Sequence, residues 1–226
     1  SADAYFNLSN LLKDQGYLED AEKIGLKGIE LNPNSPIAQN NLGIVFYIQK
    51  KYIEAEKYFK KSIEINTNNS NAYFHLAKIY IQKGDIQKAL NLIRKANQSN
   101  QKNIDIKKEL ISILIKTEIP ENILEAEKIA KETIKIHPNE SSIYICHAAV
   151  LNEQKRYQES LISINKAIEI KPNIANYHGN LGVANRQLGN LKESEVNFKV
   201  ALNMKANNYS FEFQLVEVLM DQNKKE

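Results

Sequence analysis

Hydrophobic side chains recur at intervals of three and four positions in two successive segments of each stretch of about 34 residues. In the first stretch these positions are Tyr5, Leu8 and Leu12, followed by Gly16 and then by Ala21, Ile24 and Ile29. Apolar residues at i, i+3, i+4 and i+7 line one face of an α-helix, and glycine is frequent in turns. The pattern predicts pairs of amphipathic helices joined by short turns.

Three columns of residues share one period along the chain. Small residues in the second segments are spaced by 34, 34, 37, 34 and 34 positions: Ala21, Ala55, Ala89, Ala126, Ser160 and Ser194. A second column, in the first segments, consists of Leu8, Leu42, Leu76, Leu110, His147 and Leu181. A third column closes each unit and consists of Pro33, Thr67, Gln101, Pro138, Pro172 and Ala206. A shared period marks a repeat architecture. We expect six repeats, at 2–35, 36–69, 70–103, 104–140, 141–174 and 175–208, with three extra residues in the fourth.

Small side chains also recur where two helices of a repeat would cross. One column holds Gly43, Ala77, Ala148 and Gly182, and another holds Gly28, Ser62, Ala96, Ala167 and Ala201. Close helix crossings require small residues, since bulk would push the helices apart. We therefore expect an all-α solenoid of helical hairpins, formed as a single domain over residues 1–226, with an extra helix at 209–222.

Two segments carry a recognisable pattern of residues. They are Asn41-Leu42-Gly43-x-x-Phe46 with Ala55-x-x-x-Phe59, and Tyr73-x-x-Leu76-Ala77-x-x-Tyr80 with Ala89-x-x-x-Ile93. The chain thereby resembles tetratricopeptide-repeat (TPR) proteins over nearly its whole length. The resemblance implies a right-handed α-solenoid that acts as a non-catalytic scaffold and binds a protein or peptide segment in its concave groove.

Composition narrows the range of partners. The 226 residues are 42% hydrophobic and 25% charged, and the net charge is +3. That surplus is too diffuse to favour nucleic acid, which attracts dense clusters of Lys and Arg. No stretch approaches the roughly 20 apolar residues of a membrane span. We expect no nucleic-acid partner and no membrane insertion.

The single cysteine and the first residues bear on where the protein resides. Cys146 alone cannot form an internal disulfide, which is compatible with a reducing compartment. The chain begins with Ser1 instead of Met and lacks the layout of a signal peptide. We expect a fragment of a longer protein that resides in the cytoplasm.

The residues that carry catalysis in other proteins are scattered here. Glycine-rich phosphate loops and the H-E-x-x-H and G-x-S-x-G motifs are absent from the sequence. The histidines are dispersed along the chain, at His75, His137, His147 and His178. We expect no catalytic residues, no metal site and no cofactor, and hence no enzyme activity from this chain alone.

The face of each first helix opposite its packing stripe is more apolar than a purely solvated face would be. Apolar side chains there indicate either packing between neighbouring first helices or a groove for a partner, and aromatic residues are typical interface anchors. Neighbouring Asn and Lys residues would hydrogen-bond or charge-pair with a ligand. The candidate peptide-binding residues are Phe6, Asn7, Asn10, Asn41, Ile44, Tyr47, Phe74, Lys78 and Lys108.

Two subgroups of TPR proteins provide comparisons for this face. One binds the acidic, EEVD-type C-terminal tails of heat-shock chaperones through a clamp of Lys, Asn and Arg. Asn10 and Asn41 match its asparagines, but Phe6 replaces the first lysine and Asn71 and His75 replace the last cations. Without charge-assisted bonds the clamp fails, so we expect no chaperone-tail partner. The other subgroup, the O-linked N-acetylglucosamine transferase repeats, carries an asparagine ladder, which Asn7, Asn41 and Asn180 match in part.

The C-terminal helix is predicted to be apolar on two sides. Phe211, Leu215, Val218 and Leu219 extend the solenoid register, while Phe213, Val216 and Met220 form a second apolar stripe. A terminal cap should have a polar outer face, so this helix is a candidate for homo-oligomer formation. Two further functions stay open: a substrate-recruiting arm of a larger enzyme, such as a glycosyltransferase-like or other modifying enzyme, and a self-assembling structural module.

Overall fold

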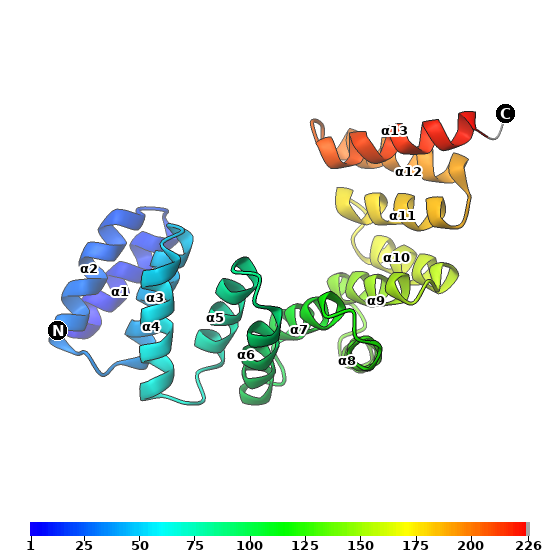
Figure 1. The fold of residues 1–226 in the computed structure, drawn as a ribbon. Helices are drawn as coiled ribbons and strands as arrows, with labels where there is room; N and C mark the ends of the chain where they lie inside the picture. The colour runs from blue at the N-terminus through cyan, green and yellow to red at the C-terminus, as the bar shows by residue number, and fades with distance from the viewer. Residues whose placement is uncertain (225–226) are drawn as a thin grey trace. The chain divides into compact units, whose positions relative to one another are not determined.

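The computed structural model describes residues 1–224, which form thirteen α-helices and no strand (Figure 1). They are α1 (Ala2–Asp14), α2 (Leu18–Leu31), α3 (Pro36–Ile48), α4 (Tyr52–Ile65), α5 (Ser70–Gln82), α6 (Ile86–Ser99), α7 (Ile104–Lys116), α8 (Pro120–Ile136), α9 (Ser141–Glu153), α10 (Tyr157–Ile170), α11 (Ala175–Gln187), α12 (Leu191–Met204) and α13 (Tyr209–Asn223). The prediction of an all-α solenoid is confirmed.

The described residues group into two compact units, the first of residues 1–113 and the second beginning at residue 114. We call them unit 1 and unit 2 and describe each by itself. The expectation of one domain over 1–226 stays a prediction.

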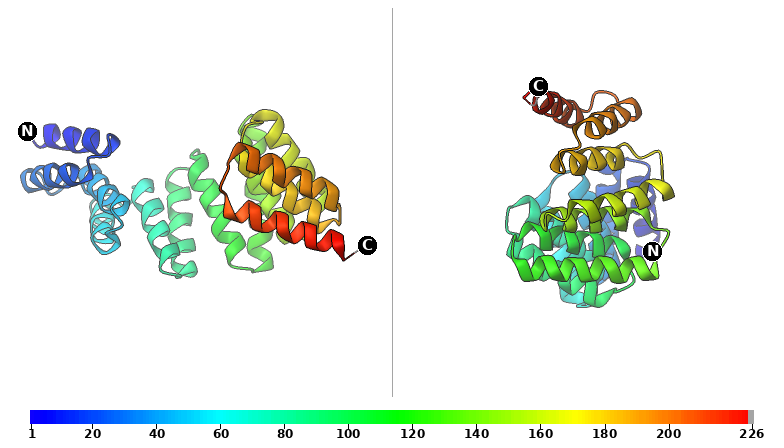
Figure 2. Two further views of the ribbon diagram at one scale, coloured as in Figure 1. Left: turned by 90° about the horizontal axis from the view of Figure 1, so that it is seen from above. Right: turned by 90° about the vertical axis from the view of Figure 1, so that its right-hand side faces the viewer.

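Each predicted repeat holds one pair of helices, beginning with α1 and α2 and ending with α11 and α12. Within each unit, the two helices of a pair pack against each other, and the second helix of one pair contacts the first helix of the next (Figures 1 and 2). First helices of unit 1 also contact one another, as α1 does α3 and α3 does α5. Stacking of this kind buries faces that an isolated hairpin would expose.

The columns of small residues lie where the helices of a pair cross. Ala21, Ala55, Ala89 and Ala126 are fully buried. In the last two repeats this column changes to serine, at Ser160 and Ser194, and the hydroxyl of Ser194 donates a hydrogen bond of 2.7 Å to the carbonyl of Gly182. A polar group is tolerated there because its hydrogen-bonding capacity is satisfied.

Aromatic rings fill the space above two glycines. A Cβ atom on Gly43 would lie 2.7 Å from the ring of Phe59, and one on Gly182 would lie 2.9 Å from that of Phe198. Both rings are fully buried. Only glycine admits such an approach without displacement of the ring, so this pairing fixes the spacing of α3 and α4, and of α11 and α12.

The turn inside every pair has one residue with a left-handed backbone. These residues are Gly16, Lys50, Gly84, Glu118, Lys155 and Gly189, with φ between +56° and +85°, and they occur at the repeat spacing. Glycine adopts this conformation without the steric cost that other residues bear. The turn geometry is therefore retained in all six repeats although only three of them have glycine.

The three extra residues of the fourth repeat lengthen a helix. The second helix has 14 residues in the other pairs, whereas α8 has 17 and starts at Pro120. Proline suits the first turn of a helix, where its missing N–H group has no partner to lose. The insertion thus adds most of one turn to the start of α8 and leaves the turn before it unchanged.

A glutamate near the start of several second helices ties its pair to the next one. Glu22 contacts Lys51 at 2.7 Å, and Glu56 contacts Lys83. In unit 2, Glu127 contacts Arg156 at 2.9 Å and Glu195 accepts a 2.9 Å hydrogen bond from Gln222. These contacts link each of these repeats to the next one and orient the two relative to each other.

None of the helices in residues 1–224 is long and apolar enough to span a bilayer.

Candidate functional site

Three of the predicted site residues meet on α3 and α5 of unit 1. The ammonium group of Lys78 lies 5.9 Å from the ring centroid of Tyr47 and 5.4 Å from that of Phe74. All three side chains are half-buried. We call these residues the Tyr47–Phe74–Lys78 cluster. A cation over aromatic faces is stabilised by about 0.5–1 kcal/mol at exposed sites.

His75 lies behind this cluster. Its ring stacks on Phe59 at 5.4 Å and 9°, and its centroid is 5.9 Å from that of Tyr47 and 5.2 Å from that of Phe74. Burial lowers the pKa of His75 to about 4, and the charges of Lys78 and Lys13 act in the same direction. The imidazole is therefore neutral at neutral pH, and it supports the aromatic rings of the cluster.

The electrostatic surroundings of the cluster are mixed. Burial raises the pKa of Tyr47, and Tyr52 and Glu109 add to the effect. The phenol of Tyr47 thus stays protonated and is able to donate a hydrogen bond. Lys78 has no carboxylate partner among residues 1–224, so its positive charge is not neutralised by a salt bridge within that part of the chain.

Other predicted residues of this face have local polar partners. Lys13 donates a 2.6 Å hydrogen bond to the side-chain oxygen of Asn10. Lys108 pairs with Asp105 at 2.6 Å, one turn away on α7. Asn41 lies 3.5 Å from the side-chain amide of Asn40. These contacts orient the side chains but do not bring them into the Tyr47–Phe74–Lys78 cluster.

Two further candidates differ in exposure. Ile44 is half-buried on α3, whereas Asn7 is exposed on α1. The grouping of all nine candidates on one binding surface stays a prediction.

Phe6 does not follow the predicted pattern. Its ring packs on Gly28 of α2, where an added Cβ would lie 2.6 Å from it. The helical spacing predicts this side chain on the face turned away from the second helix, and that prediction is wrong. Glycine at position 28 leaves a hollow between α1 and α2, and the half-buried Phe6 ring fills it.

The same column of first-helix residues serves repeat packing elsewhere. Asn40 is buried, and Gly179 is covered by the ring of Phe211 from α13. The apolar face was predicted either to pack between neighbouring helices or to form a groove for a partner. Packing therefore applies to part of this face. Positions farther along the helix, such as Tyr47 and Lys78, stay at the surface.

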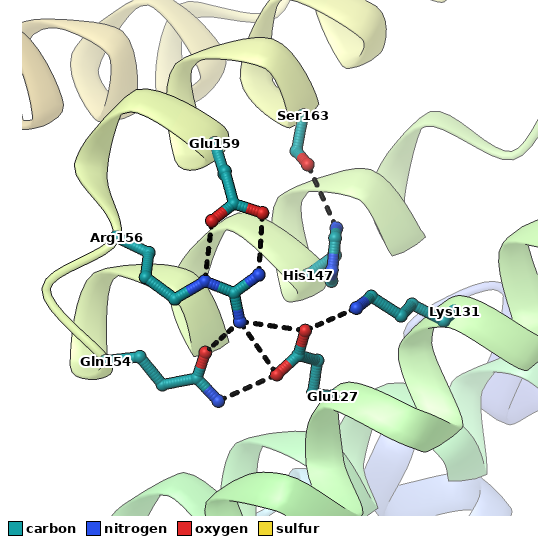
Figure 3. Close-up of polar contacts among 7 residues, drawn as sticks. All are labelled: Glu127, Lys131, His147, Gln154, Arg156, Glu159 and Ser163. Atoms are coloured by element: carbon teal, nitrogen blue, oxygen red, sulfur yellow. Dashed lines mark hydrogen bonds and ion pairs between the residues drawn. The ribbon is translucent and has the colours of Figure 1, made fainter.

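A second polar cluster, in unit 2, has no counterpart among the predicted residues (Figure 3). Glu127 accepts hydrogen bonds from Arg156 at 2.9 and 3.0 Å and from Gln154 at 2.8 Å, and it pairs with Lys131 one turn along α8. Burial acts to raise the pKa of Glu127, but the bonds from these three partners outweigh it and hold the pKa at about 2. Arg156 also donates two hydrogen bonds to the carboxylate of Glu159.

A sequence signal for this cluster exists. Glu22, Glu56, Glu127 and Glu195 occupy one repeat position, directly after the small-residue column, and Arg156 is one of only three arginines in the chain. The column marks the contacts between repeats, which orient neighbouring helices. Among residues 1–224, no three His, Cys, Asp or Glu side chains gather in a way that would hold a metal ion.

The second stripe on α13 is exposed, as the sequence predicts. Phe213, Val216 and Met220 have 62%, 53% and 57% of their surfaces accessible, while Val218 is buried against α12. Whether this stripe mediates self-association stays a prediction.

Comparison with known proteins agrees with this geometry. Family models described as tetratricopeptide repeat match residues 2–35 and 46–114. No curated protein matches the chain by sequence.

Several solved structures share the fold. YrrB, described as a TPR protein with an unusual peptide-binding site, is 19% identical with a TM-score of 0.62, and the match covers 83% of this chain and 95% of YrrB. PilF of Pseudomonas aeruginosa is 14% identical with a TM-score of 0.77, covering 96% and 97%. A chain of the APC/C hetero-tetramer Cut9–Hcn1 is 13% identical with a TM-score of 0.80, covering 97% of this chain, which spans 43% of that one.

Pairs of antiparallel helices, repeated at 34 residues with small residues at their crossings, define a helical-repeat protein of the solenoid class. By sequence, residues 2–35 and 46–114 are tetratricopeptide repeats, and the chain has the fold of tetratricopeptide-repeat proteins. Tetratricopeptide repeats in general form protein-interaction scaffolds and not catalytic domains.

Proposed function

We propose that this protein is a non-catalytic scaffold, and that the Tyr47–Phe74–Lys78 cluster of unit 1 anchors a segment of a partner protein. The observation that carries the proposal is the position of one lysine over two aromatic rings from successive first helices. The unusual peptide-binding site of YrrB, a protein of the same fold, is consistent with this use of the repeats.

The chemistry of the cluster indicates which segment would bind. Two half-buried aromatic rings offer apolar contact area with few rotatable bonds, which is why such rings dominate interface energetics. Lys78 has a charge that no carboxylate in residues 1–224 neutralises. The matching partner is an extended segment with an apolar side chain next to one Asp or Glu.

The nearby polar residues would orient such a segment. The phenol of Tyr47 remains protonated, since burial raises its pKa. Asn10 and Asn41 lie on α1 and α3, the first helices that precede α5. Amide side chains hydrogen-bond peptide groups of any sequence, so they would hold the backbone while the cluster selects the side chains.

A pull-down from the source cell, followed by identification of the bound protein, tests the proposal. The wild-type chain should retain a partner that Tyr47→Ala and Phe74→Ala lose. Tyr17→Ala provides a matched control, because Tyr17 is an aromatic residue of the same unit, is 60% exposed and lies outside the cluster. A partner retained equally by all four proteins would show that the binding surface lies elsewhere.

A further inference from the structure

The second helix α6 of unit 1 differs in charge from the five other second helices. Those helices, α2, α4, α8, α10 and α12, carry between two and four carboxylates each. Helix α6 carries none, and the chain from residue 86 to residue 104 contains only basic charges: Lys88, Arg94, Lys95 and Lys102. This local surplus is separate from the Tyr47–Phe74–Lys78 cluster, which lies on the first helices α3 and α5.

Two of these cations are held in the same way. The ammonium group of Lys88 lies 4.3 Å from the ring centroid of Tyr80, and that of Lys95 lies 5.7 Å from the ring centroid of Tyr73. Both rings are buried, and both lysines are exposed. Because an aromatic face attracts a cation, the rings hold two positive charges in defined positions at the surface.

The two lysine–tyrosine pairs have a regular spacing. Lys88 and Lys95 are seven residues apart on α6. Tyr73 and Tyr80 are likewise seven residues apart on α5, which runs antiparallel to α6. Seven residues are two turns, so the two pairs lie on one face and about 10 Å apart along the helix axis. The exposed side chains around the two lysines are uncharged: Gln87, Asn91 and Gln98.

The carboxylates at the start of α6 and beside Tyr80 are already engaged. Asp85 caps α6 by accepting a 3.0 Å hydrogen bond from the backbone N–H of Lys88. Glu56 accepts a 2.6 Å hydrogen bond from the hydroxyl of Tyr80 and pairs with two other lysines. Lys88 and Lys95 have no carboxylate partner within residues 1–224. Their charges are therefore available to the carboxylates of another molecule.

We propose that this face of α6, defined by Lys88, Lys95, Tyr73 and Tyr80, binds an acidic segment of a partner protein. Two carboxylates about 10 Å apart match the two ammonium groups, and three residues of an extended chain span that distance. The matching segment therefore has Asp or Glu at positions i and i+3. Nucleic acid is the poorer match, because duplex DNA carries one charge per about 1.7 Å of its axis and this face fixes only two cations.

NMR titration of the ¹⁵N-labelled full chain with two isomeric peptides tests this proposal. Acetyl-Ser-Glu-Ser-Ser-Glu-Ser amide has the expected spacing, and acetyl-Ser-Ser-Glu-Glu-Ser-Ser amide has the same composition with adjacent carboxylates. Saturable shifts of the α6 amides are expected, and the first peptide should bind at least about three-fold more tightly. Equal affinities of the two peptides would overturn the proposal. Tighter binding of a thymidine trinucleotide, which also carries two negative charges, would overturn it too and would assign the face to nucleic acid.

Variants that remove two charges locate the binding. Lys88→Gln combined with Lys95→Gln should weaken binding of the first peptide by about five-fold. Lys166→Gln combined with Lys199→Gln is the matched control, because these two lysines of unit 2 are paired with glutamates, and it should bind as the wild type does. Both double variants should remain folded, since all four lysines are exposed. Equal weakening by the two double variants would show that net charge alone attracts the peptide and would contradict the site.

Discussion

The turn residue inside each repeat keeps the same backbone conformation although its side chain varies. All six turns place a residue in the left-handed region, yet Lys50, Glu118 and Lys155 carry a Cβ there. A left-handed conformation costs a non-glycine residue roughly 1–2 kcal/mol. The packing of the helix pairs therefore maintains these turns against a local preference.

Lys155→Gly is expected to stabilise the protein by about 0.5–1 kcal/mol, since relief of the left-handed strain exceeds the added entropy of the unfolded chain. Chemical denaturation would measure the change. The converse substitution is Gly84→Ala, at a position with φ of +78° and no atom within 4 Å of an added Cβ. It should destabilise by a similar amount. Equal stability of both variants and the wild type would show that the turns are not strained.

His75 should make stability depend on pH. The unfolded chain takes up a proton near the ordinary pKa of 6.5, whereas the folded protein does so only near 4. The contribution of the neutral ring is complete above pH 6.5 and is lost as the pH falls toward 4. His75→Asn uses the residue that Asn7, Asn41 and Asn180 provide at this repeat position.

Urea denaturation between pH 7.5 and 4 should show a steeper loss of stability for the wild type than for His75→Asn. Parallel curves for the two proteins would mean that the folded and unfolded pKa values of His75 are the same.

Single residues differ in how far the sequence predicts their role. The alanine column is buried as expected, because a 34-residue period fixes which residues meet at a helix crossing. The prediction for Phe6 is wrong, because the hollow over Gly28 depends on which flank of α1 meets α2. His147 of α9 forms a hydrogen bond with Ser163 of α10. The sequence did not predict this contact, because it joins residues of two repeat columns and each column was considered separately.

At the scale of helices, close crossings set the tolerance to substitution. Ala89 is fully buried at the crossing of α5 and α6. Ala89→Trp is expected to cost at least about 1–3 kcal/mol through overpacking. Thermal denaturation followed by circular dichroism would measure it. Ala206→Trp in the loop after α12 is a suitable control, because Ala206 is exposed. A melting temperature equal to that of the wild type would show that the crossing can open without cost.

The exposed stripe on α13 gives a prediction about association. Tyr209, Phe213, Val216 and Met220 are separated by four, three and four positions, the spacing of a helix–helix seam. We expect light scattering to show a mass that rises with protein concentration, and Phe213→Ser with Met220→Ser to abolish the rise. If the double variant associates as the wild type does, the interface lies elsewhere.

At the scale of the whole molecule, the period determines most of the architecture. Helix number and the location of the insertion follow from column spacing, and both are observed. The predicted helix pairs that lie within one unit are observed as well. The candidate surface is less predictable. The 100° spacing of helix residues placed Tyr47, Phe74 and Lys78 on one face, but it did not reveal that Lys78 lies over both rings or that His75 supports them.

In unit 1, the side chains that bind the partner are expected to differ from those that stabilise the fold. Phe74 is half-buried and contacts Lys78 and His75, so its truncation should leave the hairpin crossings intact. Loss of an interface anchor commonly costs about 2 kcal/mol or more in binding, while a surface change costs about 0.5 kcal/mol or less in stability. The two quantities can therefore be distinguished in one variant.

The most direct test is calorimetric titration of the captured partner into Phe74→Ala, combined with a melting curve of the same sample. We predict an affinity at least about 30-fold weaker than that of the wild type, with a melting temperature within about 2 °C of it. An early melting transition together with wild-type affinity would contradict the account and would assign Phe74 to the packing between repeats.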